Sequence, residues 1–100
     1  MIEEPDMMPL DLSDVLDALS DKTRRRILLR LAVADFCCSS FSDLGPKTRL
    51  AYHFARLERS GLIHVTKSGR RRILSLRREQ VEAFFPGVLP AVLQNTPDHL

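Results

Sequence analysis

The sequence predicts a mainly α-helical domain with one small β-hairpin. Three segments repeat apolar residues at helical spacing, which is typical of amphipathic helices. A later segment has strand-forming residues on both sides of the turn sequence KSGR, which is typical of a hairpin. The chain has 100 residues, 44% of them hydrophobic and 28% charged, so it suits a single domain with a modest core.

Two short helices are predicted first. The sequence LDLSDVLDALS, residues 10–20, has an apolar stripe that consists of Leu12, Val15, Leu16 and Leu19. Ser20 or Asp21 can cap a second helix, DKTRRRILLRLA, whose inward-facing residues are Ile27, Leu28 and Leu31. The charged residues of this helix that can face outward are Arg24, Arg25 and Arg30.

A third and longer helix is predicted in PKTRLAYHFARLERSG. Pro46 suits the first helical position and Gly61 suits the end of the helix. The buried stripe of this helix consists of Leu50, Phe54 and Leu57. The preceding residues, 33–45, are less periodic and predict a loop or a short helix.

The hairpin and a last helix complete the predicted domain. LIHVTKSGRRRILSL predicts the hairpin, and the last helix follows it with an interruption at Pro86 and Gly87. We therefore expect one domain over residues 10–94. A flexible acidic arm, residues 1–9, precedes this domain, and a loose tail, residues 95–100, follows it.

Charge is strongly segregated along the chain, although the net charge is only +2. Residues 1–21 hold seven acids and no bases, whereas residues 22–78 hold all fifteen Lys and Arg together with three acids. Residues 79–100 hold three acids and no bases. A basic centre of this kind favours a protein that binds a phosphate backbone, and a solvated charged surface is the alternative.

Several classes of protein are not favoured by the sequence. No apolar run approaches the roughly 20 residues of a membrane span. The start, MIEEPDMMP, is acidic and contains proline, unlike a signal peptide. We therefore expect a cytoplasmic protein with no membrane partner. The sequence has no phosphate-binding glycine loop and no nucleophile with a matching base, so we expect no enzyme, no cofactor and no small-molecule substrate.

Three motifs occur in the order found in a known family. ALSDKTRRRILLRL resembles the signature ALSDPTRxxIL of ArsR-type bacterial transcriptional repressors, with Lys22 in place of the usual proline. TRLAYHFARLERSGLI is similar to their recognition segment, STLSHHFKVLREAGLI, and RRRILSLRREQVEAFFPGVLPAVL looks like the wing and closing helix of one subgroup. The resemblance covers residues 12–93. It implies a winged helix-turn-helix that binds promoter DNA as a homodimer.

The resemblance also implies a set of DNA-contacting residues. On the recognition helix these are Lys47, Thr48, Arg49, Tyr52, His53 and Arg56, which lie outside the apolar stripe. On the wing they are Lys67, Arg70, Arg71 and Arg72, which suit a DNA backbone or a minor groove. The family usually has Ser where this chain has Ala51 and His where it has Tyr52, so a target sequence cannot be carried over. An ordinary polar helix face is the alternative interpretation.

A homodimer interface is implied for the first and last helices, which are rich in apolar residues. The expected interface residues are Leu12, Val15, Leu16, Leu19, Val81, Phe84, Phe85, Val88, Leu89 and Val92. A two-fold dimer would place two recognition helices in successive major grooves of a pseudo-palindromic site. The alternative is that these residues complete the core of a single chain.

Cys37 and Cys38 are adjacent and are the two cysteines of the chain. Metal-sensing relatives carry ELCVCDL here, with one residue between the thiols, and the closing helix of this chain lacks their His or Asp pair, so no metal site is expected. Neighbouring α carbons are about 3.8 Å apart, below the roughly 4.4 Å of ordinary disulfides, so a bond between these thiols would be strained and easily reduced.

The sequence therefore predicts a repressor that leaves DNA when Cys37 and Cys38 are oxidised by a peroxide-type signal. Four alternatives stay open. The thiols can form an intersubunit disulfide, sense a metal or a metalloid such as arsenite, or serve only as packed side chains. The winged helix can also be a protein-interaction module that binds an acidic partner.

Overall fold

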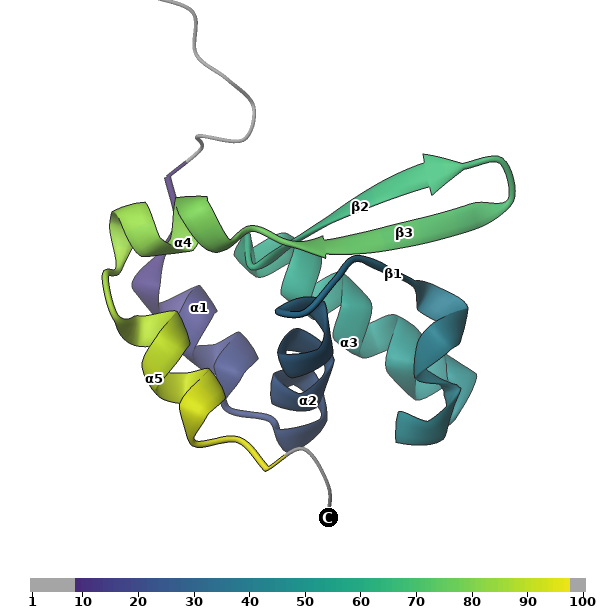
Figure 1. Ribbon diagram of the computed structural model, residues 1–100, viewed down its shortest axis with the longest axis horizontal. Coiled ribbons are helices and arrows are strands. Elements are labelled where there is room, and N and C mark those ends of the chain that lie inside the picture. Colours follow the sequence, from purple (N-terminus) through teal and green to yellow (C-terminus); the bar gives the residue numbers. More distant parts are fainter. Residues whose placement is uncertain (1–8, 98–100) are drawn as a thin grey trace, which may run out of the picture.

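The computed structural model describes residues 9–97, and Figure 1 shows its arrangement. Residues 1–8 of the predicted arm and 98–100 of the predicted tail lie outside the described residues. The helices are α1 (Leu12–Leu19), α2 (Lys22–Leu31), the 3-10 helix η2 (Cys38–Leu44), α3 (Lys47–Ser60), α4 (Arg78–Phe84) and α5 (Val88–Gln94). The strands are β1 (Phe36–Cys37), β2 (Ile63–Ser68) and β3 (Arg71–Leu76). The predicted fold class, mainly α with a small β-hairpin, is confirmed.

Aspartate side chains begin the first two helices. The Asp11 carboxylate accepts a hydrogen bond from the backbone N–H of Asp14 at 3.0 Å, and the Asp21 carboxylate accepts one from the N–H of Arg24 at the same distance. Each carboxylate satisfies an amide of the first turn that has no partner within the helix. Asp21, rather than Ser20, is therefore the cap of α2.

Gly61 ends α3 in a backbone conformation that strongly favours glycine. Its φ of 88° lies in the left-handed region, and its N–H donates to the carbonyl oxygens of Leu57 and Glu58. A Cβ at this position would lie 2.3 Å from the side chain of Leu10. The backbone conformation therefore favours glycine, as predicted, and a larger residue would also have to displace the end of the Leu10 side chain. Pro46 precedes the first helical residue instead of occupying that position.

The sheet has the order β1-β3-β2 and is antiparallel throughout. A two-residue turn, Gly69–Arg70, joins β2 to β3, and only Gly69 has a positive φ (65°), the pattern of a type II′ turn. The sequence predicted only a two-stranded hairpin. The structure corrects this prediction, because β1 adds a third strand in which Phe36 pairs with Leu74 and Cys37 with Ile73. The hairpin extends away from the helices, while β1 ties the segment before η2 to its base (Figure 1).

The core lies between the helices and the near face of the sheet, with α2 in contact with α1, α3, α5 and β3. Its largest fully buried side chains are Phe41, Ile27, Leu28, Leu57, Leu62, Ile63, Leu74, Leu89, Val15 and Val81. The interruption predicted at Pro86 and Gly87 separates α4 from α5. Within residues 9–97 no helix has the length and apolar character needed to cross a membrane.

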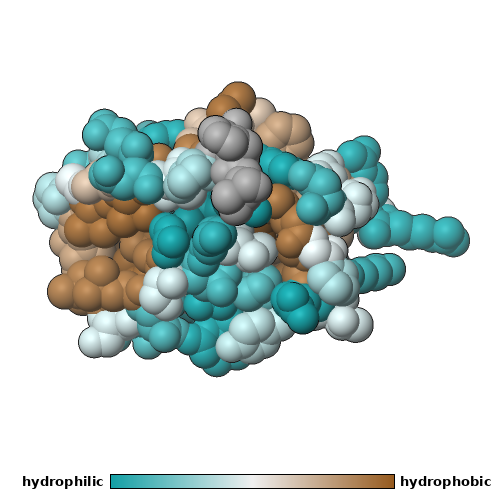
Figure 2. All heavy atoms as spheres, turned by 90° about the horizontal axis from the view of Figure 1, so that it is seen from below, coloured by the Kyte–Doolittle hydropathy of each residue, from teal (hydrophilic) through white to brown (hydrophobic). Residues whose placement is uncertain are grey.

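The residues predicted for a dimer interface fall into two groups. Four are buried within the chain itself, namely Val15, Leu19, Val81 and Leu89. The other six are exposed or half-buried, namely Leu12, Leu16, Phe84, Phe85, Val88 and Val92. Figure 2 shows hydrophobic surface at the end of the molecule that holds α4 and α5, opposite the hairpin. A partner subunit could reach only the second group.

Candidate nucleic-acid interface

The first turns of α3 present a basic and polar face to solvent. Its residues are Lys47, Thr48, Arg49 and Tyr52, all exposed. Pro46, at the N-cap, has no side chain that bonds to the amides of the first turn. These amides and the helix dipole favour a negatively charged group at this end of the helix. We call these four residues the α3 face.

His53 does not belong to the α3 face, which corrects its prediction as a DNA contact. Its side chain is buried, with 6% of the residue exposed, because it lies one turn from Leu50 and Leu57 on the inner side of α3. The Arg24 guanidinium donates to His53 Nδ1 at 3.1 Å. Since arginine is always a donor, Nδ1 must be unprotonated in this contact. Burial lowers the pKa of His53, and the nearby charge of Arg24 lowers it further.

Arg24 is also buried, although the helical pattern placed it outward. Besides His53, its guanidinium donates to the backbone carbonyl oxygens of Ala18 at 2.7 Å and Asp17 at 3.2 Å. Both carbonyl groups lie at the end of α1, where the last carbonyls of a helix have no amide donor four residues later within the same helix. A single side chain from α2 therefore joins the end of α1 to the inner side of α3. Sequence reasoning missed this residue because a buried arginine looks like any other polar residue in the pattern.

Arg56 lies at the edge of the α3 face and is already engaged. Its guanidinium forms an ion pair with the Asp17 carboxylate of α1, and it lies 6.0 Å from the centre of the Tyr52 ring. The residue is half-buried. It therefore points toward α1, in contrast to Lys47 and Arg49, which have no ion-pair partner among residues 9–97.

The wing, residues 67–72, carries four exposed cations on two faces. In the antiparallel register Lys67 pairs with Arg72 and Ser68 pairs with Arg71. Because side chains alternate along a strand, Lys67 and Arg72 share the face that looks toward α3, and Arg71 lies on the opposite face. Arg70 occupies the turn. The wing can thus present positive charge on both sides of its tip.

The two cysteines lie on opposite sides of the sheet. Cys37 pairs with Ile73 on the outer face, whereas Cys38 faces α3 and lines a groove there. The Ser39 hydroxyl donates to Cys37 Sγ at 3.4 Å. This hydrogen bond first, then the Ser39 backbone and the Arg71 side chain, lower the pKa of Cys37 from 9.0 to about 6. Cys37 is therefore mostly thiolate at neutral pH.

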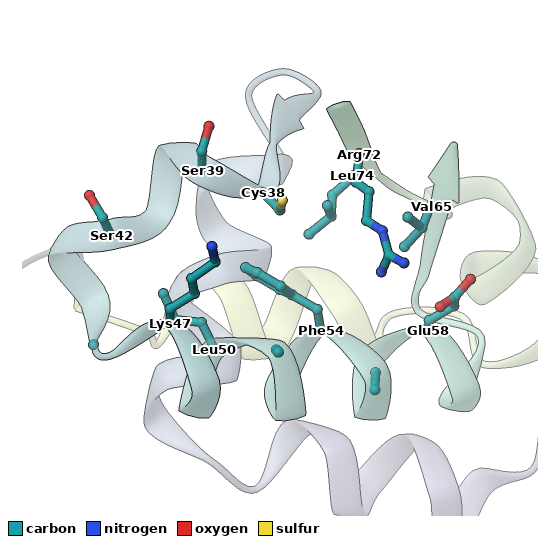
Figure 3. A pocket seen from close by; sticks show the side chains of 13 residues that line it. Cys38, Ser39, Ser42, Lys47, Leu50, Phe54, Glu58, Val65, Arg72 and Leu74 are labelled. Carbon is teal, nitrogen blue, oxygen red and sulfur yellow. The ribbon is translucent and has the colours of Figure 1, made fainter. Parts of the chain in front are cut away.

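The groove occupies about 570 Å³ between α3, η2 and the near face of the hairpin. Its apolar lining comes from Leu50, Ala51, Phe54, Ala55, Val65 and Leu74. Figure 3 shows the Cys38 sulfur pointing into this space, with Lys47 at one end and Arg72 and Glu58 at the other. Nothing in the sequence pattern indicated this groove, because its walls come from segments far apart along the chain.

Comparison with known proteins identifies the family. No protein-family model matches the chain. The HTH-type transcriptional regulator YceK of Bacillus subtilis (strain 168) is 31% identical over an 81-residue alignment that covers 77% of this chain and 81% of that protein. The crystal structure of an ArsR family transcriptional regulator matches with a TM-score of 0.65 at 31% identity, covering 73% of this chain and 86% of that one. The chain belongs to the ArsR family of transcriptional regulators.

In this ArsR regulator α3 contains the recognition segment and β2 and β3 form the wing, as the resemblance implied. Among residues 9–97 there is no group of three or more His, Cys, Asp or Glu side chains that could hold a metal ion. Of the ten predicted DNA contacts, the structure leaves eight on the α3 face and the wing. The other two are His53, which is buried, and Arg56, which forms an ion pair with Asp17 of α1.

Proposed function

We propose that this ArsR regulator is a repressor that binds a pseudo-palindromic promoter site as a homodimer, through the α3 face and the wing. The observation that carries the proposal is a set of exposed cations without ion-pair partners among residues 9–97, namely Lys47, Arg49, Lys67, Arg70 and Arg72. Unpaired cations on a recognition helix and its wing suit a DNA backbone, since binding releases the counterions of the phosphates.

The second subunit is proposed to cover the exposed apolar side chains of α1 and the half-buried ones of α4 and α5. Leu12 and Leu16 are 45% and 51% exposed and lie one turn apart on α1. A contiguous apolar surface that includes both would be stabilised by burial against a second copy. Analytical ultracentrifugation tests this point, because Leu16→Lys should raise the dimer dissociation constant by about tenfold or more. Equal dissociation constants for the two proteins would contradict the interface.

Selection of duplexes from a random pool tests the DNA-binding role. We expect enrichment of one pseudo-palindromic sequence whose two halves lie about one helical turn apart, because a two-fold dimer places its recognition helices in successive major grooves. Affinity for this sequence should fall steeply as salt rises. Absence of any enriched sequence would contradict the repressor and would favour a protein-interaction module with an acidic partner.

Oxidation is proposed to start at Cys37, whose thiolate is stabilised by Ser39 and Arg71. A peroxide converts this thiolate to a sulfenic acid and releases hydroxide. The Cys38 thiol then attacks the sulfenic sulfur, so that an S–S bond forms and water leaves. Because the two side chains lie on opposite faces of the sheet, the peptide between them must rotate first. That rotation would detach β1 from β3 and disturb the start of η2.

Fluorescence anisotropy with the selected duplex tests the redox step. Peroxide should weaken DNA binding by about tenfold or more, and dithiothreitol should restore it. Neither Cys37→Ser nor Cys38→Ser should respond to peroxide in this way. DNA binding that is indifferent to peroxide in the wild type would contradict the redox step and leave the repressor in place.

A further inference from the structure

The groove between α3 and the wing has the properties of a ligand site. Its volume of about 570 Å³ lies within the range of small-molecule pockets, roughly 300–1,000 Å³. Most of its lining is apolar, and its few polar groups stand at the two ends (Figure 3). This combination suits a ligand with an apolar body and one polar end.

The charges at the two ends differ. Lys47 stands alone at the end formed by the start of α3 and has no ion-pair partner among residues 9–97. At the other end Arg72 and Glu58 both line the groove, so that end carries charges of both signs. The Ser39 and Ser42 side chains point away from the groove (Figure 3). An anionic group is therefore stabilised at the Lys47 end, next to the free amides of the first turn of α3.

The apolar wall runs from this end along α3. Positions 47 and 58 are eleven residues apart, which is about 16 Å along a helix at 1.5 Å per residue. Between them Phe54 forms the floor, and Val65 and Leu74 of the sheet face it. An unbranched alkyl chain matches this long, narrow and apolar shape better than a compact polar metabolite does.

We propose that the groove binds a medium-chain carboxylate, with its carboxylate on Lys47 and its alkyl chain between α3 and the wing. Lys47 is also one of the cations of the DNA interface. Occupation of the groove therefore competes with DNA for this cation and fixes the distance between the recognition helix and the wing. This last consequence rests on the proposed DNA-binding function, whereas binding of the carboxylate itself does not.

Calorimetric titration of the full chain without DNA tests the binding, with decanoate as the probe and with decanol and decylamine as matched controls. Decanoate should bind more tightly than either control by about tenfold. Lys47→Gln should lower decanoate affinity by about tenfold, whereas Arg70→Gln, which removes a cation outside the groove, should leave it unchanged. Ala51→Phe fills the groove from an exposed helical position and should abolish binding while circular dichroism shows the fold retained.

Alkylation of the thiols locates the ligand, because Cys38 lines the groove and Cys37 does not. Decanoate should slow the reaction of iodoacetamide with Cys38 in the Cys37→Ser protein and should not affect Cys37 in the Cys38→Ser protein. Equal affinity for decylamine, full binding by Ala51→Phe, or no protection of Cys38 would overturn the proposal.

The coupling to DNA is tested separately by anisotropy. Decanoate should weaken binding of the selected duplex to the wild type and should have little effect on Lys47→Gln. An unchanged DNA affinity at saturating decanoate would overturn the competition. If no duplex binds at all, the proposed function fails, and the titration and alkylation results still decide whether the groove is a carboxylate site.

Discussion

The two sides of α3 use polar residues in opposite ways. On the inner side His53 is buried and bonded to Arg24, which also holds the end of α1. On the outer side Lys47 and Arg49 are exposed and have no ion-pair partner among residues 9–97. Polar residues at neighbouring positions of α3 therefore have different roles. The inner ones set the orientation of the helix, and the outer ones are available to a ligand.

Replacing Arg24 should give the largest effect on stability. Arg24→Ala removes three hydrogen bonds and leaves His53 Nδ1 and the Ala18 carbonyl without the donor that Arg24 supplies, whereas the Asp17 carbonyl keeps its hydrogen bonds from Ser20. We expect the free energy of unfolding to fall by about 3 kcal/mol. Urea denaturation measures this change. Arg49→Ala, an exposed arginine on the adjoining helix, should change it by less than about 0.5 kcal/mol. Equal losses of unfolding free energy in the two variants would contradict the distinction between the inner and outer sides of α3.

Replacing Arg49 should give the reverse result in DNA binding. Arg49→Ala should lower affinity for the selected duplex by about tenfold, since it removes a cation from the start of the recognition helix. If its partner is a phosphate, the slope of log affinity against log salt should also decrease by about one. Anisotropy at several salt concentrations measures both quantities. An unchanged affinity would show that the α3 face does not contact DNA.

Arg56→Ala tests the boundary between the inner and outer sides of α3, because Arg56 lies at the edge of the α3 face. Its ion pair with Asp17 holds the guanidinium toward α1, so DNA affinity should fall by less than about threefold. The same variant should lose at most about 1 kcal/mol of stability, as partly exposed ion pairs do. A loss of DNA affinity as large as that of Arg49→Ala would mean that the pair with Asp17 opens on the DNA.

The smallest expected effect is a pH dependence of stability. The pKa of His53 is lowered below 6.5 in the folded protein, chiefly by burial. The unfolded chain therefore binds a proton first as the pH falls, and the stability contributed by neutral His53 is lost below about pH 6.5. Urea denaturation between pH 7.5 and 5.5 checks this, with His53→Gln as the control. The variant should have a flatter profile. A steeper fall in the variant would assign the effect to another group.

Periodicity predicted the helices well because most residues of their apolar stripes are buried, although Leu12 and Leu16 of α1 are exposed and Phe54 of α3 is half-buried. Leu50 and Leu57 of α3 are buried as expected, and Gly61 ends the helix in the left-handed conformation. The hairpin followed from the turn sequence around Gly69. These features depend on residues close together in the chain, and local patterns are sufficient to predict them.

The features that the sequence did not predict all depend on contacts between distant segments. The strand β1 has two residues and exists because Phe36 and Cys37 pair with β3, more than thirty residues away. His53 and Arg24 are polar residues whose burial depends on the hydrogen bond between them and on the bonds of Arg24 to the carbonyls at the end of α1. The groove likewise needs the position of the wing relative to α3. Resemblance to the ArsR family gave the role of the helix, but it did not separate inner from outer polar residues.

Mapping of the DNA contact by nuclear magnetic resonance tests the central claim most directly. The selected duplex is titrated into isotopically labelled protein, and backbone amide shifts are followed for every assigned residue. The account predicts that the largest shifts occur at residues 47–52 and 67–72, with little change along α1 and α5. Shifts that are largest on α1 and α5, or no shifts at DNA concentrations that saturate binding, would contradict it.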